Sequence, residues 1–199
     1  MAPPPVTRAR LARAAAWTAA LGGAATAGWL GLVTGALPAD LGVGRRTRAL
    51  GPLTADIAAP REVVFDVVAQ PYLGRAPRAM RAKLNVLERG GDLVLAKHFT
   101  PVAGGRLTAV TVETVRFTRP GRVDFRLVRG PVPEVTESFV LGEHAGGTRL
   151  VYEGRMGTDL WRLGQWWGAA VAARWEGAVA ASLATVRTEA ERRAAAARR

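Results

Sequence analysis

The chain has 199 residues, of which 49% are hydrophobic and 22% charged, and its formal net charge is +12. This length suits one domain with an appendage, and the composition is that of a globular protein. The absence of cysteine excludes disulfides, thiolate nucleophiles and cysteine metal sites. The basic residues are almost all arginines spread along the chain, so the charge alone does not identify a nucleic-acid-binding protein, and we expect no nucleic-acid partner.

The N-terminal region starts with a basic tail at residues 1–13 and continues as an uncharged run at residues 14–36, AAAWTAALGGAATAGWLGLVTGA. As a helix this run is long enough to cross a bilayer, and it is apolar on every side. It predicts one transmembrane helix and a single-pass location in the cell membrane, with the side of the folded domain left open. The alternatives are a signal peptide cleaved after Thr34-Gly35-Ala36 and a helix that stays outside the bilayer.

Residues 37–51 predict a linker, because Pro38, Gly42 and Gly44 interrupt any periodicity. The folded domain is expected at residues 52–190. It opens with a strand in which Leu53, Ala55 and Ile57 alternate with polar residues. A helix follows, with Pro60 at its start and Pro71 at its end. A second short helix is expected in PYLGRAPRAM.

Six strand-like segments come next, separated by glycine and proline turn signals. Their short connections predict an antiparallel meander. They are KLNVLER, DLVLAKHFT, RLTAVTVETVRFT, RVDFRLVRG, VPEVTESFVLGE and TRLVYEGRMG.

The C-terminal segment predicts one long amphipathic helix from Asp159, as N-cap, to about Ala195. Trp161, Gly168 and Trp175 lie in one row of this helix. The basic tail at 191–199 has lost the apolar stripe and is expected to project into solvent.

This order of elements resembles the SRPBCC superfamily (START-like), and within it the polyketide cyclase/dehydrase and lipid-transport-like group. The residues that carry the resemblance are the run from Ile57 through Pro60 to Phe65, the strand GTRLVY at 147–152, and the tryptophans of the last helix. The resemblance implies an α+β helix-grip fold, with a curved antiparallel sheet wrapped around the C-terminal helix and a cavity for an apolar ligand between them. An N-terminal transmembrane helix is not usual in the superfamily.

Candidate ligand-binding residues follow from strand alternation. Val135, Glu137, Phe139 and Leu141 share one face, so Glu137 lies among apolar neighbours and must be paired, protonated or in contact with a ligand. Tyr152 offers a hydroxyl on the next strand. The remaining candidates are Phe125, His98, Trp161 and Trp175. For each candidate the alternative is core packing or a position at the rim from which the side chain reaches solvent. The face of the sheet to which Glu113 points stays unassigned.

The sequence contains no metalloprotease, nucleophile-elbow or phosphate-loop motif, so no catalytic residues are assigned, and we expect no cofactor and no metal. The function that we expect is binding or transport of a hydrophobic small molecule, lipid or polyketide-like, by a membrane-anchored domain. The alternative is a cyclase, aromatase or dehydratase that uses Glu137, Tyr152 or His98 in the same cavity. The oligomeric state is left open.

Overall fold

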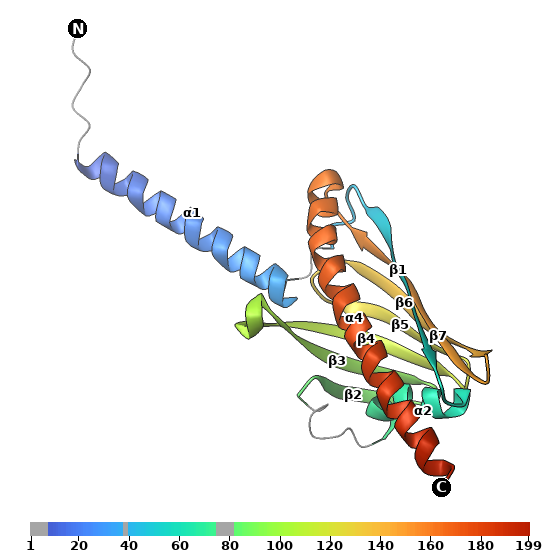
Figure 1. Cartoon of the computed structure of the whole chain (residues 1–199). Helices are drawn as coiled ribbons and strands as arrows, with labels where there is room; N and C mark the ends of the chain where they lie inside the picture. The colour runs from blue at the N-terminus through green and yellow to red at the C-terminus, as the bar shows by residue number, and fades with distance from the viewer. Residues whose placement is uncertain (1–7, 38–39, 75–81) are drawn as a thin grey trace.

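A computed structural model describes residues 8–37, 40–74 and 82–199, without the side chains of residues 8–16. In chain order the elements are α1 (Arg8–Thr34), β1 (Arg46–Ile57), α2 (Arg61–Leu73), β2 (Leu84–Gly90), β3 (Leu93–Val102), the 3-10 turn η1 (Ala103–Gly105), β4 (Leu107–Thr118), β5 (Arg122–Arg129), β6 (Glu134–His144), β7 (Gly147–Thr158) and α4 (Trp161–Ala197) (Figure 1).

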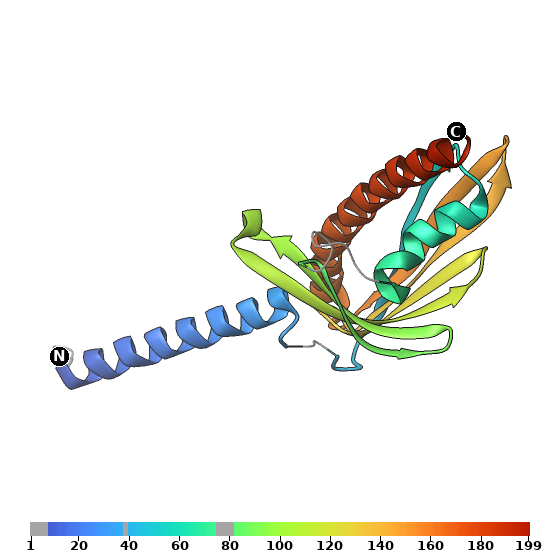
Figure 2. The ribbon, with the colours of Figure 1, turned by 90° about the horizontal axis from the view of Figure 1, so that it is seen from below.

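The strands form a seven-stranded sheet in the order β1-β7-β6-β5-β4-β3-β2. Every neighbouring pair is antiparallel. The strands β2 to β7 follow one another as a meander, and β1 closes the far edge beside β7. The sheet bends around α4 and α2, which both lie on its concave side (Figure 2). The predicted curved antiparallel sheet with one long C-terminal helix is therefore confirmed.

The strand β1 begins at Arg46, inside the stretch that we predicted as a linker. Its first residues pair with the end of β7, where Arg46 lies opposite Thr158. They resemble a linker in sequence because an edge strand tolerates exposed arginines. The register shifts between Leu50 and Leu53. At this bulge Gly51 has a φ of +76°, and an added Cβ would lie 2.9 Å from the Tyr152 carbonyl oxygen, so glycine is required there.

The helix α2 starts after Pro60 and includes Pro71 in its last turn, so it extends slightly beyond the predicted end. Beyond Pro71 the Gly74 amide still donates to the Gln70 carbonyl oxygen at 2.9 Å, so the helix does not end at the proline. The second short helix predicted after Pro71 falls largely on residues 75–81, which lie outside the described residues.

The helix α4 begins at Trp161, with Leu160 rather than Asp159 at the N-cap position. The predicted capping role of Asp159 is wrong, because its carboxylate faces the connecting segment before β1. It accepts hydrogen bonds from the backbone amides of Leu41 and Gly42 at 2.7 and 2.8 Å and pairs with Arg45 at 2.8 Å. Asp159 therefore fastens the connecting segment to the start of α4.

The C-terminal turns of α4 are exposed at Arg192 and at residues 195–199, but one side of them is packed against the domain. Ala190 and Ala194 are buried, and the Arg193 guanidinium donates to the Gln70 side chain of α2. Alanine lets the two helices approach closely, so the loss of large apolar residues here marks a close contact rather than a solvated end. Nearer the middle of α4, Glu176 accepts the Gly51 amide at 2.8 Å, and further along, Glu191 accepts the Ala58 amide at 3.1 Å.

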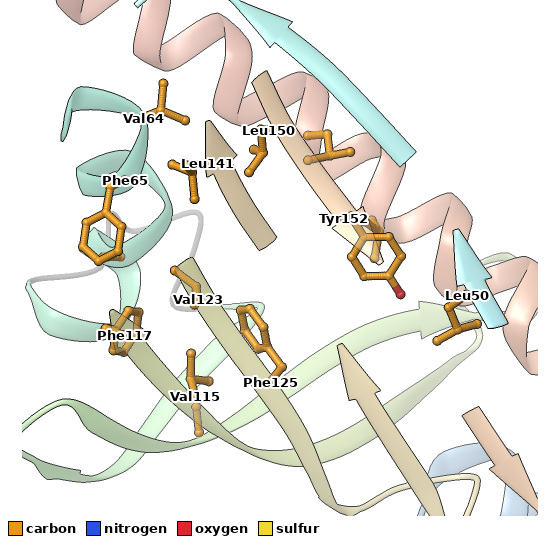
Figure 3. Close-up of a cluster of buried hydrophobic side chains, with 14 of the residues drawn as sticks. Leu50, Val64, Phe65, Val115, Phe117, Val123, Phe125, Leu141, Leu150 and Tyr152 are labelled. Atoms are coloured by element: carbon orange, nitrogen blue, oxygen red, sulfur yellow. The ribbon is translucent and has the colours of Figure 1, made fainter. Parts of the chain in front are cut away.

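The hydrophobic core lies between the concave face of the sheet, α2 and the inner side of α4. Phe65 of α2 packs edge-to-face on Phe117 of β4, with ring centroids 6.4 Å apart. Leu150 and Tyr152 of β7 are fully buried on the same face. Figure 3 shows these side chains together with others of α2 and of the strands β1, β4, β5, β6 and β7, which converge in the same region.

The helix α1 covers the uncharged run and leads away from the folded domain (Figure 1). Its C-terminal end contacts the domain, where Trp29 packs edge-to-face on Trp167 of α4 at 5.2 Å. Arg129 also donates to the Ala36 carbonyl at 2.6 Å. Within the described residues, no helix combines the length and the hydropathy that a membrane crossing needs. The predicted span at 14–36 is thus not confirmed.

Candidate functional site

The carboxyl group of Glu137 is the central polar group of the concave face. Alternation along β6 turns Glu137 to the same side as Val135 and Leu141, which are buried. One oxygen, Oε2, accepts two hydrogen bonds, from the Tyr152 hydroxyl at 2.8 Å and from the Trp175 indole Nε1 at 2.7 Å. The side chain is thereby fixed between β7 and α4, and both donors bind the same oxygen.

Burial, and secondarily the nearby charge of Glu113, raise the pKa of Glu137 from 4.5 to about 7. The hydrogen bonds from Tyr152 and Trp175 act in the opposite direction but are weaker. Because Oε2 already accepts two donors, a proton on this carboxyl group belongs on Oε1. Near neutral pH, Glu137 is therefore in part a neutral acid that can donate a hydrogen bond through Oε1.

Aromatic rings line the concave face from Glu137 toward α2. Phe139 packs on Tyr152 with centroids 5.4 Å apart, and Phe125 packs on Phe139 at 5.5 Å. Tyr72 of α2 continues the series at 6.0 Å from Phe125. Figure 3 shows Phe125 and Tyr152 directed into the region enclosed by the sheet, α2 and α4. Together these rings form an aromatic surface on the concave face, in which Tyr152 is fully buried whereas Phe139 and Tyr72 are half-buried.

A second polar cluster lies at the Tyr72 end of this surface. The Tyr72 hydroxyl is 3.0 Å from His98 Nε2. The other ring nitrogen, Nδ1, lies 3.2 Å from Oε2 of Glu113, at ion-pair distance but not along the direction of a hydrogen bond. Thr111 donates to the second carboxylate oxygen at 2.6 Å. Strand pairing explains the proximity, because His98 lies directly opposite Thr111 on β4.

His98 and Glu113 each favour the charged form of the other. Burial lowers the pKa of His98, but the Glu113 carboxylate opposes it, and the net pKa lies above its ordinary value. Burial likewise raises the pKa of Glu113, yet His98 and Thr111 outweigh it and hold the pKa below the usual range. Burial raises the pKa of the Tyr72 hydroxyl, which stays protonated. The cluster thus combines a phenol with a carboxylate and an imidazole, each of which favours the charged form of the other.

Several of these side chains are half-buried although they face the side that the helices cover. Glu137, Phe139, Tyr72 and Trp175 all retain partial exposure, and the His98 side chain is 22% exposed. These side chains are therefore accessible from outside the core, although they face the helices. A hollow of about 890 Å³ is lined by Glu137 and Phe125 of this site, together with residues of the convex face that include Arg126 and Ser138.

Six of the seven predicted ligand-binding residues lie on or beside the aromatic surface. They are His98, Phe125, Glu137, Phe139, Tyr152 and Trp175. Trp161 does not join them. It is 53% exposed at the start of α4, where its ring lies against Gly44.

Sequence reasoning missed Tyr72, Thr111 and Glu113. The register of Glu113 with Val115 and Phe117 pointed to the concave face, but Val110 and Val112 on the alternate positions obscured it. Tyr72 follows a proline that was interpreted as the end of its helix, so no sequence signal placed it in the core.

No family model and no curated relative matches the chain. Among solved structures, the chain is similar to the Zhui aromatase/cyclase from Streptomyces sp. R1128, with 19% identity, a TM-score of 0.57, and coverage of 75% of this chain and 95% of that one. The chain has the helix-grip fold. The protein TTHA0849 from Thermus thermophilus is similar over 77% of this chain and 97% of its own, with 19% identity and a TM-score of 0.51. The di-domain aromatase/cyclase StfQ from the steffimycin biosynthetic pathway gives 13% identity and a TM-score of 0.55, over 76% of this chain and 52% of that protein.

At these identities the helix-grip likeness establishes architecture, and it confirms the fold that the SRPBCC resemblance implied. The chemistry of the site must be argued from Glu137, His98 and their partners.

Proposed function

We propose that the helix-grip domain binds an apolar small molecule that carries a hydroxyl or carbonyl oxygen, in the space between the curved sheet and α4. The observation that carries this proposal is the geometry of Glu137. Two donors fix its Oε2, while within the described part of the chain no hydrogen bond reaches its Oε1. Oε1 is thus open to a further polar partner beside the aromatic rings, and a ligand oxygen would supply one.

The ring series from Tyr152 to Tyr72 supports an apolar and extended or polycyclic ligand body. Phe125 and Phe139 lie between the two polar ends, so a ligand along this surface would meet Glu137 at one end and Tyr72 with His98 at the other. Lipids and polyketide-like molecules have this combination of an apolar body and isolated oxygens.

Native mass spectrometry of the full chain in mild detergent, compared with a denatured extract, tests whether a small molecule copurifies. Binding of an apolar fluorescent probe, measured on the same preparation, gives a second readout. The Glu137→Gln variant should change the affinity for an oxygen-bearing ligand severalfold. The matched control is Thr136→Ala, because Thr136 adjoins Glu137 on β6 but faces the convex side. Equal affinities in both variants, or no bound molecule and no probe binding, would contradict the proposal.

A second function, conversion of the ligand by a cyclase-, aromatase- or dehydratase-type reaction, is favoured by one observation. A carboxyl group with a pKa of about 7 and the His98–Glu113 pair share one face, so a proton donor and an acceptor are available to the same molecule. The test compares the molecule that copurifies with the wild type with the one that copurifies with Glu137→Gln. Identical molecules would exclude conversion at Glu137, whereas a different, unreacted molecule in the variant would support it.

We further propose that residues 14–36 associate the chain with a membrane. The support is the apolar surface of α1, on which Trp17 and Leu21 are about two-thirds exposed. Carbonate extraction of native membranes distinguishes the modes of association. Retention in the pellet supports a helix embedded in the bilayer, release supports a peripheral one, and a mature chain that begins near Leu37 would establish a cleaved signal.

A further inference from the structure

Exposed large apolar side chains are concentrated at one end of the molecule. Apart from Leu73 and Leu87, all such side chains found exposed within the described residues belong to α1, to the segment that follows it, to the end of β5 or to the first turns of α4. Seven of them form what we call the Trp-rich end: Leu37, Leu41, Val43, Leu160, Trp161, Leu163 and Trp166.

Backbone contacts hold the Trp-rich end together. The Leu160 amide donates to the Val43 carbonyl at 2.8 Å, and the Trp161 amide donates to Gly44 at 3.0 Å. Asp159, only 3% exposed, fixes the same segment through Leu41. The apolar side chains are therefore presented outward from an ordered base. Exposure of 66% for Trp166 and 64% for Leu163 shows that the rest of the described chain leaves them uncovered. An apolar cluster of this kind marks an interaction surface.

The charge around the Trp-rich end is positive. Arg46, Arg48 and Arg162 are exposed, and no ion pair involving them occurs within the described residues. By contrast, the nearby carboxylates of Asp40 and Asp159 are both paired with Arg45. Uncompensated arginines beside exposed tryptophan and leucine match the interfacial region of a bilayer that contains anionic lipids.

We propose that the Trp-rich end docks on the surface of an anionic lipid bilayer. This inference rests on the proposed membrane association, but it concerns the folded domain itself and does not require α1 to cross the bilayer. The position of α1 supports it, because α1 leaves the domain beside this end (Figure 1). A second copy of the chain is a poorer occupant, because it would bring two sets of unpaired arginines together.

Docking in this orientation would place the ligand site next to the lipid phase. Trp167 is half-buried, touches Trp29 of α1 on one side and packs on the hydrophobic core on the other. Two turns further along α4, Trp175 holds the Glu137 carboxyl group. The inner side of α4 thus leads from the Trp-rich end to the site, which would let an apolar ligand exchange with the bilayer without crossing water.

The absence of cysteine makes a site-specific test possible in the full chain. Leu163→Cys and Leu87→Cys are each labelled with an environment-sensitive fluorophore. Leu87 is the matched control, because it is exposed and apolar but lies on β2, away from the Trp-rich end. Each protein is added from mild detergent to vesicles of phosphatidylcholine, with or without phosphatidylglycerol, and vesicle binding is measured by flotation.

The expected result is a severalfold rise in fluorescence at position 163 with phosphatidylglycerol vesicles, quenching there by nitroxide-labelled lipid, and little change at position 87. Flotation without a change at position 163 overturns the docking surface, and so does failure to float. A rise at position 163 that needs no vesicles and grows with protein concentration assigns the surface to a second copy instead. Binding of the apolar fluorescent probe to unlabelled L163C protein, measured without vesicles, shows separately whether the ligand-binding proposal holds.

Discussion

Replacing Glu137 by glutamine should make the protein more stable at alkaline pH. Glutamine preserves the shape of the side chain, and its carbonyl oxygen can still accept the Tyr152 and Trp175 hydrogen bonds, but it cannot ionise. The folded-state pKa of Glu137 is raised from 4.5 to about 7, mainly by burial. In the unfolded chain the same group ionises near its ordinary pKa. The folded wild type therefore holds a proton that the unfolded chain has lost over this pH window.

Proton linkage determines whether the stability of the wild type rises or falls with pH. Where the folded state binds more protons than the unfolded state, stability falls as the pH rises. The contribution of Glu137 is fully present below about pH 4.5 and is lost as the pH passes 7. One pKa unit corresponds to about 1.4 kcal/mol, so the loss amounts to about 3 kcal/mol. The variant has no such loss, because its side chain stays neutral throughout.

Urea unfolding of the full chain, followed by circular dichroism from pH 5 to pH 9, measures the difference between wild type and E137Q. We expect E137Q to gain about 3 kcal/mol relative to wild type between pH 5 and pH 9, or roughly 6–12 °C in Tm for a domain of this size. His98 and Glu113 titrate in both proteins and largely cancel. The control is Glu153→Gln on the exposed convex face of β7, which should show no such trend. A difference between E137Q and wild type that stays constant with pH would refute the reasoning.

Three further changes test individual contacts by urea unfolding. Tyr152→Phe removes a hydrogen bond that lowers the pKa of Glu137, so the folded-state pKa should rise. The loss of stability with pH should then extend to higher pH and become larger, and about 1 kcal/mol should be lost at low pH. His98→Ala leaves the Glu113 carboxylate buried without its counter-charge and should cost about 3–5 kcal/mol, whereas the double variant H98L/E113L, which buries no charge, should lose less. Asp159→Asn weakens the contacts to the connecting segment, so it should cost about 1–3 kcal/mol and speed proteolysis near residues 40–45. The control is Asp124→Asn, which removes one partner of an exposed ion pair and should change stability by less than about 0.5 kcal/mol.

The order of the strands and the long last helix could be predicted because period-2 alternation and turn residues are local signals. They also placed Glu137 correctly, since its neighbours at 135, 139 and 141 are all apolar. The His98–Glu113 pair could not be predicted in this way. It depends on the register between β3 and β4, which hydrogen bonding sets across the hairpin and which neither strand encodes alone.

Three sequence features were misinterpreted, because each was judged from its own segment alone. Asp159 has the residue type of an N-cap, yet its carboxylate serves a segment that lies far away in the sequence. The alanine-rich end of α4 lacks an apolar stripe, but close helix packing needs small residues rather than large ones. In residues 14–36 the lack of charge shows only that insertion meets no large penalty. Alanine and glycine contribute little of the apolar gain that a bilayer crossing requires.

The carboxylates of Glu176 and Glu191, which accept the amides of Gly51 and Ala58, determine how α4 can move. Fifteen helical residues advance about 22 Å, and seven strand residues advance about 23 Å, so the two contacts match in spacing. A shift of α4 by one turn would break both contacts at once and leave two backbone amides unpaired. Any opening of the interior at the Trp-rich end should therefore move α4 and β1 together as one unit.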